Sequence, residues 1–325
     1  MRRRDFIKGI AGSAAAWPLA AHAQRPATPI VGFLRNTSQA PFQNLGVAFG
    51  QGLKEAGFVE GQNVAIEYRY ADNQIDRLPA LVADLIRLPV AVIVVNSGAA
   101  FAAKAATTTV PIVFAAGDDP VKSGLVPSLN RPGGNITGVS WLGGLVGTKR
   151  LELLRRVVPK ATTIAMLVQP NRSDTEPERK DVQVAARAIG LQLITLDVSS
   201  DRDIESAFAT LVQRGAGALL VGIGAYLASK RESIITPASR YAIPAMYPLR
   251  EEVVAGGLMS YAPSQSNAYH QAGIYVGRIL KGEKPADLPV MQSTKFEFVL
   301  NLKTAKTLGL DVPMIIQMTA DEVIE

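Results

Sequence analysis

The chain has 325 residues, which is enough for two medium domains or one large one. It contains no cysteine, and this excludes disulfides, thiolate metal sites, a cysteine nucleophile and a lipid-modified cysteine. The formal net charge is +6, but Lys and Arg are scattered among acidic residues, so we expect no nucleic-acid partner, which would need a clustered basic face.

Residues 1–23 have the pattern of an export signal. Arg2-Arg3-Arg4 belongs to a basic start, residues 10–20 are mostly small and apolar, and Ala21-His22-Ala23 has the form of a cleavage site. A transmembrane anchor is disfavoured because the apolar run is too short and is broken by Pro18. We therefore expect a signal peptide that is removed after export.

The route of export is left open by the residues of the basic start. The run from Arg3 to Lys8 resembles the twin-arginine signal, but Arg2 stands where Ser or Thr is more usual, and ordinary Sec export is the alternative. With Gln24 as the first mature residue, the mature net charge is about +3, because four basic residues and one acidic residue leave with the signal. We expect a periplasmic protein that is not lipid-anchored.

From residue 28 onward, short apolar runs alternate with segments of helical periodicity. The first half is predicted to form strands at 30–34, 64–70, 91–95, 111–115 and 136–140, and helices from 41 to about 57, over 76–88, up to about 107 and over 123–129. The second half is predicted to form strands at 163–168, 191–197, 218–221, 243–246, 257–261 and 296–300, and helices at 148–158, 174–189, about 204–212, up to about 240, 264–280 and 304–308.

This alternation of strands and helices predicts an α/β fold built on parallel sheets with right-handed crossovers. Most of the expected strands are apolar throughout, as sheets covered on both faces require. Each half opens with the same order of strand, polar loop, helix, glycine and strand. We therefore expect two similar lobes, each with its own sheet.

The residues that follow the expected strands are the candidates for a binding site, because ligands of open α/β sheets bind beyond the carboxyl ends of the strands. They combine hydrogen-bonding, aromatic and charged side chains, which favours a small polar or zwitterionic ligand. The candidates are Thr37, Ser38, Asn96, Ser97, Gly98, Asp118, Asp119, Trp141, Gln169, Asn171, Gly224, Tyr226, Tyr247, Arg250 and Tyr261.

Charged groups in this set suggest how a ligand would be held. The backbone amides after Ser97 or the guanidinium of Arg250 can bind a carboxylate, and Asp118 or Asp119 can accept an ammonium group. Each residue also has a structural alternative, in which the aspartates only cap a helix and Arg250 is a solvated helix start. An aromatic or aliphatic part of the ligand would pack on Trp141, Tyr226 or Tyr247.

Catalytic motifs are absent from the sequence. His270 is the only histidine outside the signal, and neither GxSxG, HExxH nor a P-loop is present. The Gly222-Ile223-Gly224 fragment lacks the third glycine of a dinucleotide-binding loop. We expect no catalytic residue, no metal and no cofactor. An exported hydrolase that uses Asp118 and Asp119 is a distant alternative, because adjacent residues rarely face each other across a scissile bond.

Several segments resemble a bacterial ABC-transporter substrate-binding protein family, some of whose members bind aromatic amino acids such as tryptophan. The most specific is LNRPGGNITGVS at 129–140, preceded by Asp119-Pro120 and Gly124-Leu125-Val126. Further similarity lies in YVGRILKGEKPADLP, within 272–289, and in FVLNLKTAKTLGL at 298–310. The resemblance covers nearly all of the mature chain.

The resemblance implies a periplasmic-binding-protein fold of the type I-like class, with two Rossmann-like lobes joined by three crossover strands. Lobe one would comprise 28–140 plus 262–285, and lobe two 142–256 plus 288–325. The crossings would lie near 140–142, 256–261 and 286–290.

The implied function is that of the binding component of an ABC uptake system. A small solute, with an amino acid or an aromatic or organic acid favoured, would bind between the lobes, and hinge closure would bury it. A membrane permease would recognise the closed monomer, and another chain would hydrolyse ATP. A receptor of the same fold that feeds a sensor kinase is the alternative.

Overall fold

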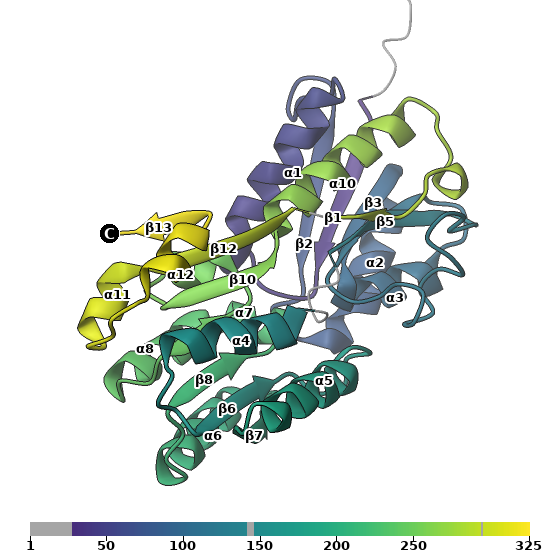
Figure 1. Ribbon diagram of the computed structural model, residues 1–325. Coiled ribbons are helices and arrows are strands. Elements are labelled where there is room, and N and C mark those ends of the chain that lie inside the picture. The colour runs from purple at the N-terminus through teal and green to yellow at the C-terminus, as the bar shows by residue number, and fades with distance from the viewer. Residues whose placement is uncertain (1–27, 142–145, 294) are drawn as a thin grey trace, which may run out of the picture.

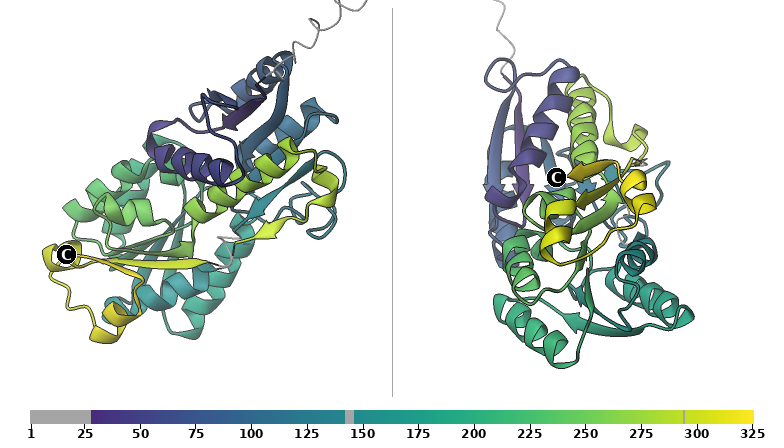
Figure 2. Two further views of the ribbon diagram at one scale, coloured as in Figure 1. Left: turned by 90° about the horizontal axis from the view of Figure 1, so that it is seen from above. Right: turned by 60° about the vertical axis from the view of Figure 1, so that its left-hand side comes forward.

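The computed structural model describes residues 28–141, 146–293 and 295–325. Within these ranges the chain forms two β-sheets, each with helices on both faces, and the two sheets lie in separate halves of an elongated molecule (Figure 1 and Figure 2). None of the described helices is both long and apolar enough to cross a lipid bilayer. The predicted α/β fold with two parallel-dominated sheets is confirmed.

The first sheet has six strands, and every strand pair in it is parallel. In spatial order the strands are β11 (Met291–Gln292), β5 (Ile136–Ser140), β4 (Ile112–Ala116), β3 (Val90–Asn96), β1 (Ile30–Arg35) and β2 (Ala65–Tyr70). The helices around it are η1 (Ala40–Phe42), α1 (Gln43–Glu55), η2 (Ile75–Arg77), α2 (Leu78–Arg87), α3 (Ser97–Ala106), α10 (Gln265–Leu280) and η4 (Pro285–Asp287).

Both faces of the first sheet are buried, and strand β3 shows how its residues divide between them. Val92 and Val94 pack in the cluster formed with α1 and α10, whereas Ile93 and Val95 pack in the cluster formed with α2 and α3. Successive side chains of a strand point to opposite faces of the sheet, so an unbroken apolar run packs against the helices on both faces.

The second sheet has seven strands, and only β10 and β12 pair in antiparallel fashion. In spatial order the strands are β13 (Glu322–Ile324), β12 (Phe296–Asn301), β10 (Met259–Pro263), β9 (Ala245–Tyr247), β8 (Ala218–Val221), β6 (Thr163–Val168) and β7 (Gln192–Asp197). Its helices are α4 (Gly147–Val157), α5 (Thr175–Ala188), α6 (Asp201–Gln213), α7 (Ala225–Ser229), α8 (Arg231–Arg240), α9 (Arg250–Val254), α11 (Leu302–Thr307) and α12 (Met314–Thr319).

The chain passes between the two sheets three times. It leaves the first sheet after β5, returns from β10 into α10, and leaves again after β11. Because β11 pairs with β5, Met291 and Gln292 lie in the first sheet, and the last crossing follows them rather than falling at 286–290. The expected division into lobes at 28–140 plus 262–285 and 142–256 plus 288–325 stays a prediction.

Three local predictions are wrong. Residues 123–129 form turns and bends instead of a helix, because Gly124 takes a φ of 77° and Pro127 cannot donate a backbone hydrogen bond. The helix expected to end at Arg240 is divided at Lys230 into α7 and α8. Tyr247, expected in a loop, is the last residue of β9.

Helices α1 and α10 come from distant parts of the sequence, lie side by side over the first sheet, and meet through glycines (Figure 1). A Cβ atom on Gly52 of α1 would collide with the carbonyl oxygen of His270, and one on Gly273 of α10 would collide with that of Phe49. These glycines therefore allow the two backbones to approach more closely than any larger side chain would permit.

We expect Gly52→Ala to lower the free energy of unfolding by about 1–3 kcal/mol, because the new methyl group forces the two helices apart. The matched control is Gly50→Ala in the same helix. A Cβ atom added at Gly50 has no atom within 4 Å outside its own helix. The free energy of unfolding of this variant should therefore rise by about 0.5–1 kcal/mol, because alanine has a higher helix propensity than glycine. Urea unfolding of the three proteins measures both effects, and equal midpoints for wild type and Gly52→Ala would refute the close contact.

Candidate functional site

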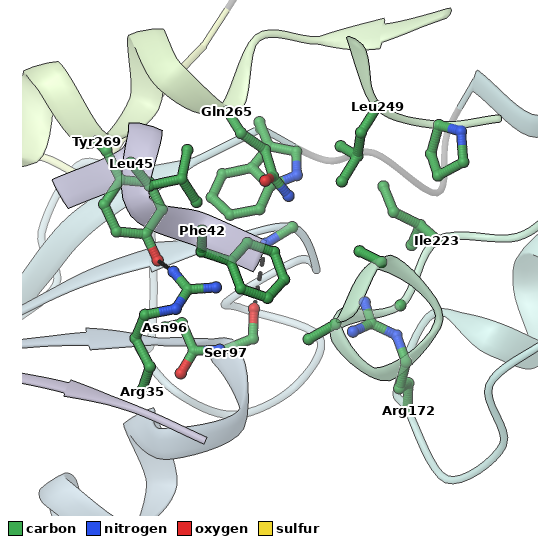
Figure 3. A pocket seen from close by; sticks show the side chains of 16 residues that line it. Arg35, Phe42, Leu45, Asn96, Ser97, Arg172, Ile223, Leu249, Gln265 and Tyr269 are labelled. Carbon is green, nitrogen blue, oxygen red and sulfur yellow. Dashed lines mark hydrogen bonds between the residues drawn. The ribbon is translucent and has the colours of Figure 1, made fainter. Parts of the chain in front are cut away.

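A cavity, here called the inner cavity, lies where the carboxyl ends of strands from both sheets face each other (Figure 3). The inner cavity has a volume of only about 40 Å³, and the hollow that adjoins it has about 540 Å³, so the two together fall within the range of about 300–1,000 Å³ found for small-ligand sites. The first sheet and its helices contribute Arg35, Phe42, Leu45, Asn96, Ser97, Gly117, Trp141, Gln265 and Tyr269. The second sheet contributes Arg172, Ile223, Gly224, Ala225, Ala228, Pro248 and Leu249.

A second hollow, here called the outer cavity, adjoins the inner one and shares Ser97, Arg172 and Ala225 with it. Its other lining residues are Asn36, Asn73, Ile75, Gly98, Phe101, Asp118, Ser123, Gln169, Pro170, Asn171, Ser173, Ser199 and Tyr226. The two cavities together form a cleft that reaches from the surface to the aromatic residues between the sheets.

Arg35 is the last residue of β1 and is only 4% exposed. Its Nη1 donates to the hydroxyl of Tyr269, its Nε donates to Thr37 Oγ1 at 3.3 Å, and its guanidinium carbon lies 4.2 Å from the centre of the Phe42 ring. Among the described residues, Arg35 forms no ion pair with a carboxylate. The remaining N–H groups of this buried cation are therefore available to an anionic ligand.

Arg172 lies across the inner cavity from Arg35, on the loop after β6 (Figure 3). Its Nε and Nη2 donate to the two carboxylate oxygens of Asp174 at 3.1 and 3.0 Å. Burial lowers the pKa of Arg172, but the nearby carboxylates of Asp174 and Asp118 outweigh burial, so the pKa is raised overall. Arg172 thus differs from Arg35 in having its charge balanced by a neighbouring acid.

The apolar part of the inner cavity is largely aromatic. Trp141 is 6% exposed, and its ring centre lies 6.5 Å from that of Tyr269 in a tilted arrangement. The Nε1 atom of Trp141 is buried without a hydrogen-bond partner among the described residues. Because a buried indole N–H usually has an acceptor, this donor is well suited to an oxygen atom of a ligand.

The junction of β3 and α3 holds the loops on the first-sheet side of the cleft. Asn96 Oδ1 accepts a hydrogen bond from the backbone N–H of Asn36 at 3.1 Å, and Ser97 Oγ accepts one from Gly117 at 3.1 Å. A Cβ atom on Gly98 would lie 2.5 Å from the Asn36 side chain, so glycine is required for this contact. The side chains of Asn96 and Ser97 are thus already engaged in positioning neighbouring loops.

A buried ion pair stands behind the second-sheet side of the cleft. Arg150 of α4 pairs with Glu178 of α5, and both side chains are almost fully buried. Arg150 Nη1 also donates to the carbonyl of Val221 at 3.2 Å, and Glu178 Oε2 accepts from the backbone N–H of Ile223 at 3.5 Å. The pair therefore fixes the loop after β8 that lines the inner cavity.

Glu252 has a similar role for the loop after β9. It is 1% exposed, and its Oε2 accepts a hydrogen bond from the backbone N–H of Leu249 at 2.8 Å. Burial raises the pKa of Glu252 to about 8. This carboxyl group is therefore neutral over much of the physiological pH range.

Most of the candidates predicted from the sequence line the cleft. Asn96, Ser97, Trp141 and Gly224 line the inner cavity, and Ser97, Gly98, Asp118, Gln169, Asn171 and Tyr226 line the outer one. The phenol of Tyr226 donates to Asp201 at 2.6 Å, and Gln169 Oε1 accepts from the backbone N–H of Tyr226 at 3.0 Å.

The other candidates lie outside both cavities. Asp119 Oδ1 accepts from the backbone N–H groups of Val121 and Lys122, so it stabilises a turn, and Arg250 pairs with Glu322 through two hydrogen bonds of 2.6 and 2.7 Å. The remaining ones are Thr37, which is buried beneath Arg35, Ser38, Tyr247, which is buried in the second sheet, and Tyr261, which stacks on Phe296.

Sequence reasoning missed twelve of the sixteen residues that line the inner cavity, among them Arg35, Phe42, Arg172, Gln265 and Tyr269. Arg35 had a visible signal, since it is a charged residue at the end of the otherwise apolar strand IVGFLR. Gln265 and Tyr269 had none, because they lie on α10, whose first turns reach the cavity only through the tertiary fold. In the described parts of the chain, no cluster of three or more His, Asp or Glu residues could hold a metal ion.

Two parallel-dominated sheets, joined by three chain crossings and facing each other across a ligand-sized cleft, define a periplasmic-binding-protein fold of the type I-like class. A conserved domain protein from Vibrio cholerae has a TM-score of 0.83 at 24% identity, over 91% of this chain and 99% of that one. An ABC domain from Streptococcus pneumonia, in complex with L-Trp, has a TM-score of 0.82 at 26% identity, over 92% and 100%.

The chain belongs to the ABC transporter substrate binding protein family, whose model matches residues 44–324. A tyrosine-binding protein of Clostridioides difficile (strain R20291) is 25% identical over 263 residues, which are 81% of this chain and 75% of that protein. The family consists of substrate-binding proteins that work with membrane permeases, and the relative from Clostridioides difficile is named as a binding protein.

Proposed function

We propose that this protein is the extracytoplasmic component of an ABC importer and binds an amino acid or an aromatic acid in the cleft that the inner and outer cavities form. The observation that carries the proposal is Arg35, a buried cation without a carboxylate partner among the described residues, in a cavity walled by Phe42, Trp141 and Tyr269. Such a cavity complements a small molecule that has a carboxylate and an apolar or aromatic part.

The relatives and the sequence support this proposal. One relative is a tyrosine-binding protein and one similar structure contains L-Trp, and both ligands have the two features that the cavity complements. The signal-like residues 1–23, which lie outside the described residues, support export to the periplasm. In the proposed cycle, the two halves close over the ligand, and a permease recognises the closed monomer.

A ligand screen tests the function. We expect L-tryptophan, L-tyrosine, L-phenylalanine or the corresponding aromatic acids to raise the Tm of the mature protein, because ligand at 100 times Kd stabilises a folded state by about 2.7 kcal/mol. Trp141 provides a second signal, since Trp17 is the only other tryptophan and lies in the expected signal peptide. Sugars and polyamines are the negative controls, and a preference for either of them would refute the proposed ligand class.

A further inference from the structure

Among the described residues, Asp118 is the only acidic residue that lines either cavity. It follows β4 directly after Gly117, which lines the inner cavity, and it lies in the outer cavity at the boundary between the two. Its Oδ1 atom is buried and has no hydrogen-bond partner among the described residues. A buried carboxylate oxygen normally accepts a hydrogen bond, so we infer that a bound ligand supplies the donor for this atom.

Arg172 lines the outer cavity together with Asp118, but it makes no hydrogen bond to the buried Oδ1 atom of Asp118. The carboxylate of Asp118 is one of the groups that raise the pKa of Arg172. However, Arg172 uses Nε and Nη2 to bind Asp174, and it makes no hydrogen bond to Asp118. The charge of Arg172 is therefore balanced by Asp174, which leaves Asp118 without a paired cation, whereas Arg35 in the inner cavity is paired with no acid among the described residues.

The charges around the inner cavity are thus separated in a defined direction, from positive at Arg35 to negative at Asp118. Arg35 is the last residue of β1 and Asp118 lies two residues beyond the end of β4, and these two strands are separated in the sheet only by β3. Neighbouring strands lie about 4.8 Å apart, so the two backbones are on the order of 10 Å apart at the strand ends. A zwitterionic ligand that extends from the inner cavity to its boundary with the outer cavity therefore has Arg35 on one side and Asp118 on the other.

We propose that the ligand is an amino acid whose carboxylate binds Arg35 and whose protonated amine binds Asp118. This inference rests on the proposed function and selects amino acids over simple aromatic acids within it. Asp118 would then determine specificity, because an acid without the amine leaves the buried Oδ1 atom unpaired. Trp141 Nε1 would add a hydrogen bond to the carboxylate or to a polar atom of the side chain.

The test compares each amino acid with its analogue that lacks the amine. L-Tryptophan is paired with indole-3-propanoate, L-tyrosine with 3-(4-hydroxyphenyl)propanoate and L-phenylalanine with 3-phenylpropanoate, and Kd values are measured by calorimetry at constant salt. For the wild type, the amino acid of the best pair should bind about 30-fold or more tightly than its analogue.

The variant Asp118→Asn should lose this preference. Its Kd for the amino acid should rise about 30-fold or more, while its Kd for the analogue should stay the same or fall. Asp119→Asn is the matched control, because the same change is made at the next residue, outside both cavities, and it should leave both Kd values unchanged. Circular dichroism and Tm values verify that the variants are folded.

The outcomes separate this inference from the proposed function. If the wild type binds the analogue as tightly as the amino acid, or if Asp118→Asn weakens both ligands equally, the role of Asp118 is refuted and the proposed function stands. If neither the amino acids nor their analogues bind the wild type, the proposed ligand class fails together with the inference.

Discussion

Replacing Arg35 by methionine should weaken the binding of the preferred amino acid or aromatic acid by about 2–5 kcal/mol, which is roughly 30- to 4,000-fold in Kd. The loss is large because the guanidinium is buried and, within the described residues, has no acid to pair with. A ligand carboxylate is then its expected counter-charge. The affinities for the amino acids and for their amine-free analogues should fall by a similar factor, since both kinds of ligand carry this carboxylate.

The same substitution should leave the unliganded protein as stable as the wild type, or make it more stable. An unpaired buried charge costs free energy in the folded state, and an apolar side chain of similar length removes that cost. If Arg35 instead served only to hold Tyr269 and Thr37, the variant would have a lower Tm and the affinity of the folded fraction would be unchanged.

Arg87→Met is the matched control for Arg35→Met. It removes the same charge from the first half of the molecule, but Arg87 is exposed and pairs with Asp84 on the surface of α2. Its Kd for every ligand should equal that of the wild type. A comparable loss of affinity in Arg87→Met would mean that net charge, and not the contact at Arg35, governs binding.

The variant Glu252→Gln should be more stable than the wild type at pH 9, by on the order of 2–4 kcal/mol. Burial, the largest influence, and the neighbouring Glu251 raise the pKa of Glu252 to about 8, whereas the Leu249 N–H, Arg150 and Arg231 act in the opposite direction. An unfolded glutamate titrates near pH 4.3 and is charged at higher pH. Folding at higher pH therefore costs free energy, because the carboxylate must either take up a proton or be buried with its charge.

The direction of the pH dependence follows from this difference. A folded-state pKa above the unfolded value stabilises the protein at low pH, and this contribution is lost as the pH rises from about 4 through about 8. Glutamine cannot ionise, so the stability of the variant should lack this decline. Urea unfolding at pH 5, 7 and 9 measures the difference between the two proteins.

Glu232→Gln makes the same chemical change on the exposed surface of α8 and should leave the pH profile of stability as it is in the wild type. If the free energy of unfolding of Glu252→Gln falls with rising pH as steeply as that of the wild type, Glu252 is not the group that causes the fall. The pKa of Glu178 is also raised by burial, but Glu178 is present in both proteins and its influence cancels in the comparison.

The elements of the fold were largely predictable because each sheet is buried on both faces. Strands such as β5, β6 and β8 were predicted with the bounds that they have, since unbroken apolar runs between loops leave little choice. A helix was wrongly predicted at 123–129 because the apolar residues there suggest one face of a helix. Gly124 instead adopts a backbone conformation with positive φ, which does not occur within a right-handed helix. The short β13 and α12 carry too few residues to show a periodicity.

The cleft was only partly predictable, for a physical reason. Counting residues beyond strand ends identified Asp118 and Trp141, because parallel strands of one sheet end at a common edge. The same rule also selected Arg250, whose guanidinium turns to Glu322 instead, and the sequence gives no sign of that partner. Tyr269 depends on a contact between distant helices, which no local pattern encodes.

The order in which the first half is assembled follows from the places of α10 and β11 in the chain. The residues that help to cover one face of the first sheet and complete its edge, 265–280 and 291–292, are synthesised after five of the seven strands of the second sheet. Until they arrive, Phe49, Val92 and Val94 have no helix α10 to cover them. The half that begins the polypeptide therefore cannot finish folding until residue 292 has been made, and a nascent chain that stops before residue 265 presents an apolar surface on which it can aggregate.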